Sequence, residues 1–447
     1  RLGTKRGASD LRPPSMPLVV ALLSPALLLP SISSAPPQRL PPPTMVAAAG
    51  SDPAALPPPL AASDGVHTFT YDSVQRRLPL IVEAVVANNP SYNAALQAEL
   101  RALADEIRAG APLRALREPS AAGWIAELAP HLDAGATWFT APWFLVENYL
   151  YKRVLELTDA PSGGADPFAA QKAESLAGSA DAFGKMAPAL AEASELAPLV
   201  MTSLWGNLAD LSLSAGAALV APADASAGGA GGASMLLADD TAALCGALEA
   251  AAGKPVTVVL DNCGLELVSD LLLVDGLLRR GAAGPSRVTL HAKDAPVFVS
   301  DVCAHDLELT LAWFEEPAQQ PAGAPLAARL RAALGDGRLK VECWPFYTGS
   351  LAFWEMPVPL RAFYRDQALV ITKGDANYRR LLGDRHWAHD TDFAELMGYW
   401  PCALAALRTC KSGVLVGTAP DAEAAAAAAH PDKWLTAGLY GMVQFRP

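Results

Sequence analysis

Short runs rich in β-branched and apolar residues alternate with helical stretches through the second half of the chain. The run at 256–260 is followed by a stretch of helical pattern that stops at Gly281. Strands that are apolar throughout and are separated by helices predict a mostly parallel sheet with helices on both faces. The fold class we expect is therefore α/β. The runs that we predict as strands are 256–260, 287–292, 339–344, 368–372 and 413–417.

The chain before these runs has a helical pattern. "SYNAALQAELRALADEIRAG" ends in Gly110, and "WFTAPWFLVENYLYKRVLELT" predicts a helix that starts near Pro142. We expect a helical N-terminal subdomain at 65–200 and an α/β core at 201–447. An Ala/Gly-rich stretch at 215–233 has the composition of a surface insertion.

Residues 1–64 are rich in Pro, Ala and Ser, so we expect a disordered leader or targeting segment there. The apolar run at 17–30 is too short to span a bilayer. We expect a cytoplasmic protein, or a plastid one if residues 1–44 are a transit peptide.

Composition narrows the class of partner. The net charge of the 447 residues is -12, which is unfavourable for nucleic-acid binding. We expect neither nucleic acid nor membrane as a partner, and the oligomeric state stays open. None of the six cysteines forms a CxxC pair, so we expect reduced thiols and no structural zinc.

Polar residues lie next to the predicted strands. In open parallel sheets ligands bind at the carboxyl ends of the strands. If these strands are adjacent, one edge of the sheet gathers acidic, amide and basic side chains. The acidic and amide members are Asp261, Asn262, Asp301 and Asp375, which Lys373, Arg408 and Lys411 could join.

This set has a chemical meaning. Carboxylate and amide oxygens are hard ligands suited to Mg²⁺ or Mn²⁺. Lysine and arginine nearby would bind phosphate, and Gly264 and Gly374 would let backbone N–H groups approach it. Taken individually, Asp261 and Asp301 are more often N-caps of the next helix, and Lys373 and Lys411 more often solvated surface lysines. The number of such positions, rather than any one of them, favours a site.

Other candidates are weaker. His386 and His389 lie in a charged stretch and are interpreted as surface residues, whereas His291 lies within a strand and is interpreted as a hydrogen-bonded core residue. The chain contains no GxSxG motif and no P-loop.

Five stretches resemble subfamily III of the metal-dependent damage-control phosphatases, and the likeness runs from about His67 to Phe445. These stretches are "SLWGNLADLSL" (203–213), "LDNCGLELVSDLLLVDGLL" (260–278), "HAKDAPVFVSDV" (291–302), "VITKGDANYRRLLGDRHW" (370–387) and "LRTCKSGVLVG" (407–417). The resemblance implies a Rossmann-like three-layer core with an N-terminal helical bundle. It implies hydrolysis of small phosphate monoesters such as fructose 1-phosphate and fructose 6-phosphate, with Mn²⁺ or Ni²⁺ as cofactor and Co²⁺ or Mg²⁺ possible.

The resemblance also assigns residues. It implies metal binding by Asp261, Asn262 and Asp301. The substrate contacts that it implies are Glu266, Lys373, Gly374, Asp375, Ala376, Asn377 and Lys411. Lys411 ends the Arg-Thr-x-Lys motif, whose first two residues are Arg408 and Thr409, and Asn207 could also line the site. From the residues themselves we expect Lys373, Arg408 and Lys411 to bind phosphate and Asp375 to orient or deprotonate a water molecule.

Two departures from the family pattern are Cys263, where Ser or Ala is usual, and Val297, where Trp is usual. Whether water or Asp261 attacks phosphorus is open, although Cys263 replaces the second aspartate that a haloacid-dehalogenase mechanism needs. An S-adenosylmethionine-dependent protein carboxyl methyltransferase is one alternative, weakened by the lack of a GxGxG turn. A non-catalytic protein that binds phosphorylated metabolites is the other.

Overall fold

The computed structural model of the protein describes residues 56–117, 122–159, 165–191, 193, 195–206, 235–316, 322–431 and 433–447. Residues 1–55 of the leader predicted at 1–64, Asn207 and the insertion at 215–233 lie outside these residues. Residues 56–64 of that predicted leader are described: they include a 3-10 helix at Ala62–Asp64, and the Leu60 N–H donates to the Asp384 carbonyl at 2.9 Å. Within them, no helix is both long and apolar enough to cross a membrane.

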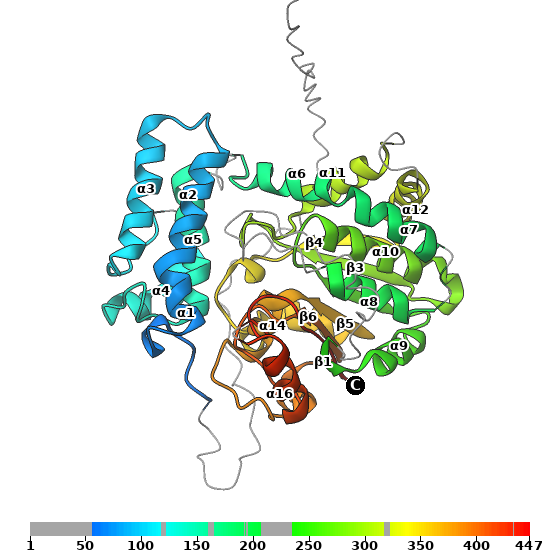
Figure 1. The fold of residues 1–447 in the computed structure, drawn as a ribbon. Coiled ribbons are helices and arrows are strands. Elements are labelled where there is room, and N and C mark those ends of the chain that lie inside the picture. Colours follow the sequence, from blue (N-terminus) through cyan, green and yellow to red (C-terminus); the bar gives the residue numbers. More distant parts are fainter. Residues whose placement is uncertain are drawn as a thin grey trace, which may run out of the picture. The chain divides into compact units, whose positions relative to one another are not determined.

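The described residues form one seven-stranded sheet in the order β1-β7-β6-β5-β2-β3-β4 (Figure 1). Neighbouring strands run parallel except β6 and β7, which are antiparallel. The α/β class with a mostly parallel sheet is confirmed. The strands are β1 (Leu236–Asp239), β2 (Pro255–Val259), β3 (Arg287–Ala292), β4 (Leu339–Cys343), β5 (Leu369–Lys373), β6 (Ala403–Thr409) and β7 (Gly441–Arg446).

Helices cover both faces of this sheet. One layer packs on Leu369 and Ile371 of β5, and the other packs on Val370, as the period of two in a strand requires. The first layer holds α7 (Ala180–Ala191), α8 (Ala197–Trp205), α9 (Thr241–Ala250), α10 (Leu265–Arg279), α11 (Ala304–Phe314) and α12 (Gly323–Asp336). The second holds α13 (Val358–Arg365), α14 (Gly374–Leu382) and α15 (Phe393–Leu396), while α16 (Pro420–Ala429) packs near β1.

The N-terminal residues are helical, and several of their helices share a separate core. That core joins α2, α3, α4 and α5 with the segment 297–299. Helices α7 and α8 instead pack on α10 of the sheet layer, so the expected bundle and its boundary at residue 200 stay predictions. The N-terminal elements are α1 (Phe69–Asp72), a π-helix (Ser73–Arg77), α2 (Leu78–Asn88), α3 (Ala94–Arg108), α4 (Ala122–Asp133), α5 (Trp143–Thr158) and α6 (Ala169–Gly178).

One predicted strand is wrong. Residues 413–417 are irregular, although Val414 and Val416 are buried as a strand would be. Backbone carbonyls of this segment accept hydrogen bonds from side chains: Arg408 donates to the carbonyl of Val414, and Gln444 donates to that of Val416. The strand beside β5 is instead β6, so residues 408–411 come at the end of a strand rather than before one.

A candidate phosphoryl-transfer site at the carboxyl edge of the sheet

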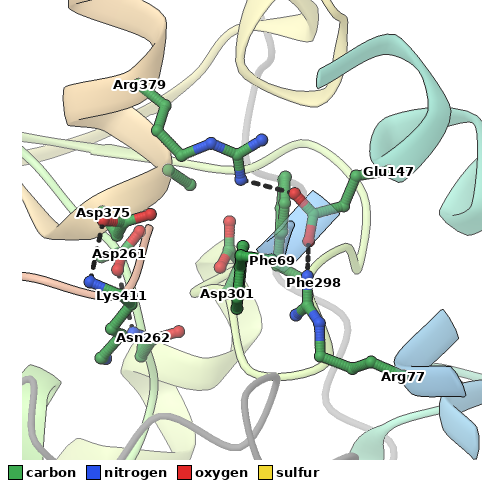
Figure 2. Close-up of a pocket in the computed structure, with 11 residues that line it drawn as sticks. Phe69, Arg77, Glu147, Asp261, Asn262, Phe298, Asp301, Asp375, Arg379 and Lys411 are labelled. Carbon is green, nitrogen blue, oxygen red and sulfur yellow. Dashed lines mark hydrogen bonds and ion pairs between the residues drawn. The ribbon is translucent and has the colours of Figure 1, made fainter. Parts of the chain in front are cut away.

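A pocket lies where β2, β5 and β6 end, and it encloses about 30 Å³ (Figure 2). Residues far apart in the sequence line it, from the N-terminal helices as well as from the sheet. They are Phe69, Arg77, Glu147, Asp261, Asn262, Phe298, Asp301, Asp375, Ala376, Arg379 and Lys411. The structure therefore brings together Asp261, Asn262, Asp301, Asp375, Ala376 and Lys411 of the predicted site residues.

A short antiparallel bridge fixes the acidic residues. Asn262 pairs with Asp301, and the Val302 N–H donates to the Asp261 carbonyl at 2.8 Å. The Asn262 amide nitrogen donates to Asp261 Oδ2 at 2.9 Å, and its Oδ1 accepts from Ser300 Oγ at 2.7 Å. Asp261, Asn262 and Asp301 are all buried, so their orientations are set by these bonds rather than by solvent.

The loop that presents Asp301 is strained. Phe298 and Val299 have φ angles of 50° and 66°, a left-handed conformation that costs non-glycine residues free energy. Packing offsets this cost, because the Phe298 ring lies 5.1 Å from Tyr151 and 6.4 Å from Phe144 between ring centroids. Such strain is typical of functional sites, where geometry is held by surrounding structure.

Lys293 is a site neighbour that the sequence did not single out. Its Nζ lies 2.9 Å from Asp301 Oδ2, and both groups are buried. It also donates to the Leu260 carbonyl at 3.3 Å, directly before Asp261. Its position immediately after β3 was the available signal.

Glycine is required at position 374 because the Asp261 carboxylate lies very close to the backbone there. Its φ is 80°, and a Cβ there would lie 1.8 Å from Asp261 Oδ2. Gly374 also begins α14, so the first backbone N–H groups of that helix start beside Asp261. The predicted 373–377 loop is thus the end of a strand and the first turn of a helix.

The Asp375 carboxylate, in this first turn of α14, is fixed by three hydrogen bonds to one of its two oxygens. Its Oδ1 accepts from Arg408 Nε at 2.8 Å, from the Lys411 N–H at 3.2 Å and from Ser412 Oγ at 3.1 Å. Arg408 is fully buried and stacks 4.3 Å from the Tyr378 ring. Its place is behind Asp375, away from the lining of the pocket, so the geometry favours a positioning role over the expected phosphate contact.

Lys373 also lies away from the pocket lining. Its Nζ lies 3.1 Å from Glu266 Oε1 and 3.3 Å from Asp270 Oδ1, and it donates to the Ser203 carbonyl at 2.5 Å. Burial opposes its charged form, but the carboxylates of Asp270 and Glu266 outweigh burial and raise the pKa of Lys373. Burial, only partly countered by Lys373, raises the pKa of Asp270 to about 7.

Further predicted contacts have internal partners. Glu266 accepts from the Asn262 amide nitrogen at 2.9 Å, so it supports a site residue from behind. Asn377 donates to the carbonyls of Lys373 and Leu260, and Thr409 is buried at the end of β6.

The histidines behave as expected. His291 is buried, with its Nδ1 2.6 Å from the Tyr347 hydroxyl, so the core interpretation is confirmed. His386 is exposed beside Asp64. Among the described residues, Cys303, His305 and Asp306 are close enough to share a metal ion, but Lys172 Nζ already lies 2.9 Å from Asp306 Oδ2 and from Asp166 Oδ2.

Comparison with known proteins identifies the class. The family model of the damage-control phosphatase ARMT1-like domain matches residues 73–426. The chain belongs to the damage-control phosphatase family, which confirms the predicted resemblance.

Two relatives with similar sequences agree with this assignment. Damage-control phosphatase ARMT1 of Danio rerio is 30% identical over 85% of this chain and 94% of its own length. The Mus musculus protein of the same name is 33% identical over 70% of this chain and 76% of its own. The solved structure of a DUF89 family protein from Pyrococcus horikoshii, 13% identical, aligns with a TM-score of 0.44 over 77% of this chain and 91% of that one.

Proposed function

We propose that the protein is a divalent-metal-dependent phosphatase that hydrolyses small phosphate monoesters. The observation that carries this proposal is the bridge between Asn262 and Asp301, which gathers three oxygen-bearing side chains beside Lys411 and the start of α14. Membership of the damage-control phosphatase family supports the same reaction class.

The donor set fits a hard divalent cation. Asp261 and Asp301 supply carboxylate oxygens, and Asn262 Oδ1 uses one of its two lone pairs on Ser300. Oxygen-only sets of this kind suit Mn²⁺ or Mg²⁺, and Ni²⁺ and Co²⁺ are the further candidates from the family likeness. A bound ion would supply positive charge close to the phosphoryl oxygens and would acidify nearby water.

The phosphate group has two partners in the chain itself. The first backbone N–H groups of α14, at Asp375 and Ala376, carry the positive end of the helix dipole and have no partner within their own helix. The Lys411 side chain lines the same pocket. We assign phosphate binding to these groups in place of Lys373 and Arg408.

Asp375 orients the attacking water in this proposal. Its Oδ1 is fixed by three donors, so the carboxylate has one orientation relative to Asp261 and Lys411. Water adds to phosphorus, the bond to the ester oxygen breaks, and the products are inorganic phosphate and an alcohol. Fructose 1-phosphate and fructose 6-phosphate are the proposed substrates on the family likeness. A cytoplasmic location stays a prediction.

The test is a screen of metals against substrates on the purified protein. Asp261→Ala should lower Mn²⁺-dependent hydrolysis of fructose 1-phosphate and p-nitrophenyl phosphate by at least about 100-fold. The matched control is Asp366→Ala, which removes an exposed carboxylate at the end of α13.

Near-normal turnover by Asp261→Ala would refute the site. Tight binding of phosphate compounds without turnover under any metal would instead support a binding protein. Metal-independent methyl transfer from S-adenosylmethionine to protein carboxylates would support the methyltransferase alternative.

A further inference from the structure

Three charged residues line the pocket without any role in the proposed metal and phosphate chemistry. Arg77, Glu147 and Arg379 form a continuous ion-paired series, which we name the Arg–Glu–Arg wall. Glu147 Oε1 lies 2.5 Å from Arg77 Nη2, and Glu147 Oε2 lies 2.6 Å from Arg379 Nη1. Figure 2 shows Glu147 and Arg77 across the pocket from Asp375 and Lys411, with Asp301 between the two sides. A molecule bound by its phosphate beside Lys411 would direct its other half toward this wall.

The wall is rigid. The Trp143 ring lies 5.7 Å from the guanidinium carbon of both Arg77 and Arg379, and Arg379 also lies 5.0 Å from the Phe144 ring. Glu147 is buried, so neither arginine can change partner without leaving a buried charge uncompensated. Rigid, preorganised groups are what a recognition surface requires.

The backbone gives an independent indication. Arg77 is the last residue of a five-residue π-helix, Ser73–Arg77, between α1 and α2. π-helical turns are rare and occur frequently at functional sites, because they direct a side chain where a regular helix would not. Here the side chain so directed reaches the pocket.

Among the described residues, the hydrogen-bonding capacity of Glu147 and Arg379 is only partly used. A carboxylate accepts about four hydrogen bonds, and the arginines take one on each oxygen of Glu147. Arg379 has five N–H donors, of which three are used on Glu147 and Asp384 among the described residues. Acceptor and donor positions therefore remain side by side, which is the arrangement that hydroxyl groups match, since each hydroxyl both donates and accepts.

The wall and Asp384, the second ion-pair partner of Arg379, together carry no net charge. Arg77 and Arg379 carry two positive charges, and Glu147 and Asp384 carry two negative ones, all within ion-pair distance. A second phosphate placed here would gain no net attraction and would lie beside the Glu147 carboxylate. The wall thus suits an uncharged group and disfavours an anionic one.

We propose that the Arg–Glu–Arg wall binds the uncharged, hydroxyl-bearing half of the substrate and makes the enzyme select polyol monophosphates against bisphosphates. This proposal rests on the proposed phosphatase function. It makes the N-terminal helical residues part of the active site, because Arg77 and Glu147 come from the π-helix and α5. The pocket volume of about 30 Å³ has room for roughly two water molecules, so the proposal includes movement of side chains at the pocket, such as half-buried Phe69, when a substrate enters.

The test compares kcat/KM for fructose 1-phosphate with kcat/KM for fructose 1,6-bisphosphate. Glu147→Gln keeps the shape but removes the negative charge between the arginines, so the ratio should fall by roughly tenfold to hundredfold. Arg77→Gln leaves the wall and Asp384 with a net negative charge, so the ratio should rise. Arg76→Gln is the matched control, since Arg76 neighbours Arg77 in the same π-helix and its side chain is 73% exposed.

The outcomes distinguish a failure of this inference about the wall from a failure of the proposed phosphatase function. An equal loss on both substrates in Glu147→Gln, with an unchanged ratio, would assign the wall a structural role and overturn the inference. If Glu147→Gln does not fold, as circular dichroism would show, Arg77→Gln decides: a ratio that falls or stays at the wild-type value contradicts the proposal. If the wild-type protein hydrolyses neither sugar phosphate nor p-nitrophenyl phosphate with any divalent metal, the proposed function itself fails.

Discussion

Lys373→Met removes the ammonium group that Glu266 and Asp270 share at the end of β5. In the wild-type protein this ammonium lies 3.1 Å and 3.3 Å from the two carboxylates, and none of the three side chains exceeds 2% exposure. Methionine has a similar volume, so the substitution leaves the packing and removes the charge. Two buried carboxylates then face each other without a cation between them.

The magnitude follows from that burial. Removing one partner of a buried ion pair costs about 3–5 kcal/mol of unfolding free energy. A protein with roughly 350 folded residues has an unfolding entropy of about 0.7 kcal/mol per kelvin, so Tm should fall by roughly 4–7 °C. A surface lysine that only binds phosphate would cost about 0–1 kcal/mol, which is a shift of at most about 1 °C.

The pH dependence has a definite sign. Burial already raises the pKa of Asp270 to about 7 with Lys373 present, and loss of the ammonium raises the pKa of Asp270 further. A carboxyl whose folded-state pKa is raised contributes stability at low pH and loses it as pH rises through the folded pKa. The Tm deficit of Lys373→Met should therefore be smaller at pH 5 than at pH 8.

Differential scanning calorimetry at both pH values measures this prediction. Lys340→Met is the control, because Lys340 is an exposed lysine on β4. A Tm for Lys373→Met within 1 °C of wild type at pH 8, or a deficit independent of pH, would show that Lys373 is not the buried counter-ion of Glu266 and Asp270, and would restore Lys373 as a candidate phosphate ligand.

Two further predictions concern geometry and burial. Gly374→Ala places a Cβ 1.8 Å from Asp261 Oδ2, so calorimetry should show Mn²⁺ affinity at least about tenfold weaker than that of the wild type. The control is Gly413→Ala, which has no atom within 4 Å of its Cβ and should bind Mn²⁺ as the wild type does. Equal affinities in both variants would show that Asp261 is not a ligand. Burial lowers the pKa of His291 to about 3, so its imidazole should stay neutral at pH 5 in histidine-selective NMR spectra. Because the pKa of histidine in the unfolded chain is near 6.5, this group should lower the free energy of unfolding as pH falls from about 6.5 to 3. Titration of His291 near pH 6 would contradict its buried placement.

The sequence predicted the parallel strands where β-branched residues are continuous. Residues 256–260, 287–292, 339–344 and 368–372 correspond to β2, β3, β4 and β5 within a residue at each end. It missed β6, because "ALAALRT" consists largely of helix-favouring residues. Pairing with β5 on one side and β7 on the other imposes the extended conformation there.

The direction of Lys373 was predictable from the period of two in a strand. Leu369 and Ile371 face the layer that contains α8 and α10, so Lys373, two residues further on, faces it too. In the same way Arg408 alternates with Leu407 and faces the opposite layer beside Tyr378. The phosphate assignments rested on the place of Lys373 after a predicted strand and of Arg408 before the predicted strand 413–417, without this alternation.

The Arg–Glu–Arg wall had no local signal. Nearly all side chains from Trp143 to Leu155 in α5 are buried, so helical periodicity does not mark the face on which Glu147 lies. Its partners are 70 residues before it and 232 residues after it. Contacts of that separation follow from the tertiary fold and are not encoded in any short motif.

Metal binding by Asp261, Asn262 and Asp301 is tested most directly by a calorimetric titration of Mn²⁺ into the wild-type protein and Asp301→Asn, with fructose 1-phosphate hydrolysis measured on the same samples. If Asp261, Asn262 and Asp301 hold the ion, the variant should bind Mn²⁺ at least about tenfold more weakly and lose activity in parallel. Unchanged Mn²⁺ affinity together with wild-type turnover in Asp301→Asn would contradict the account.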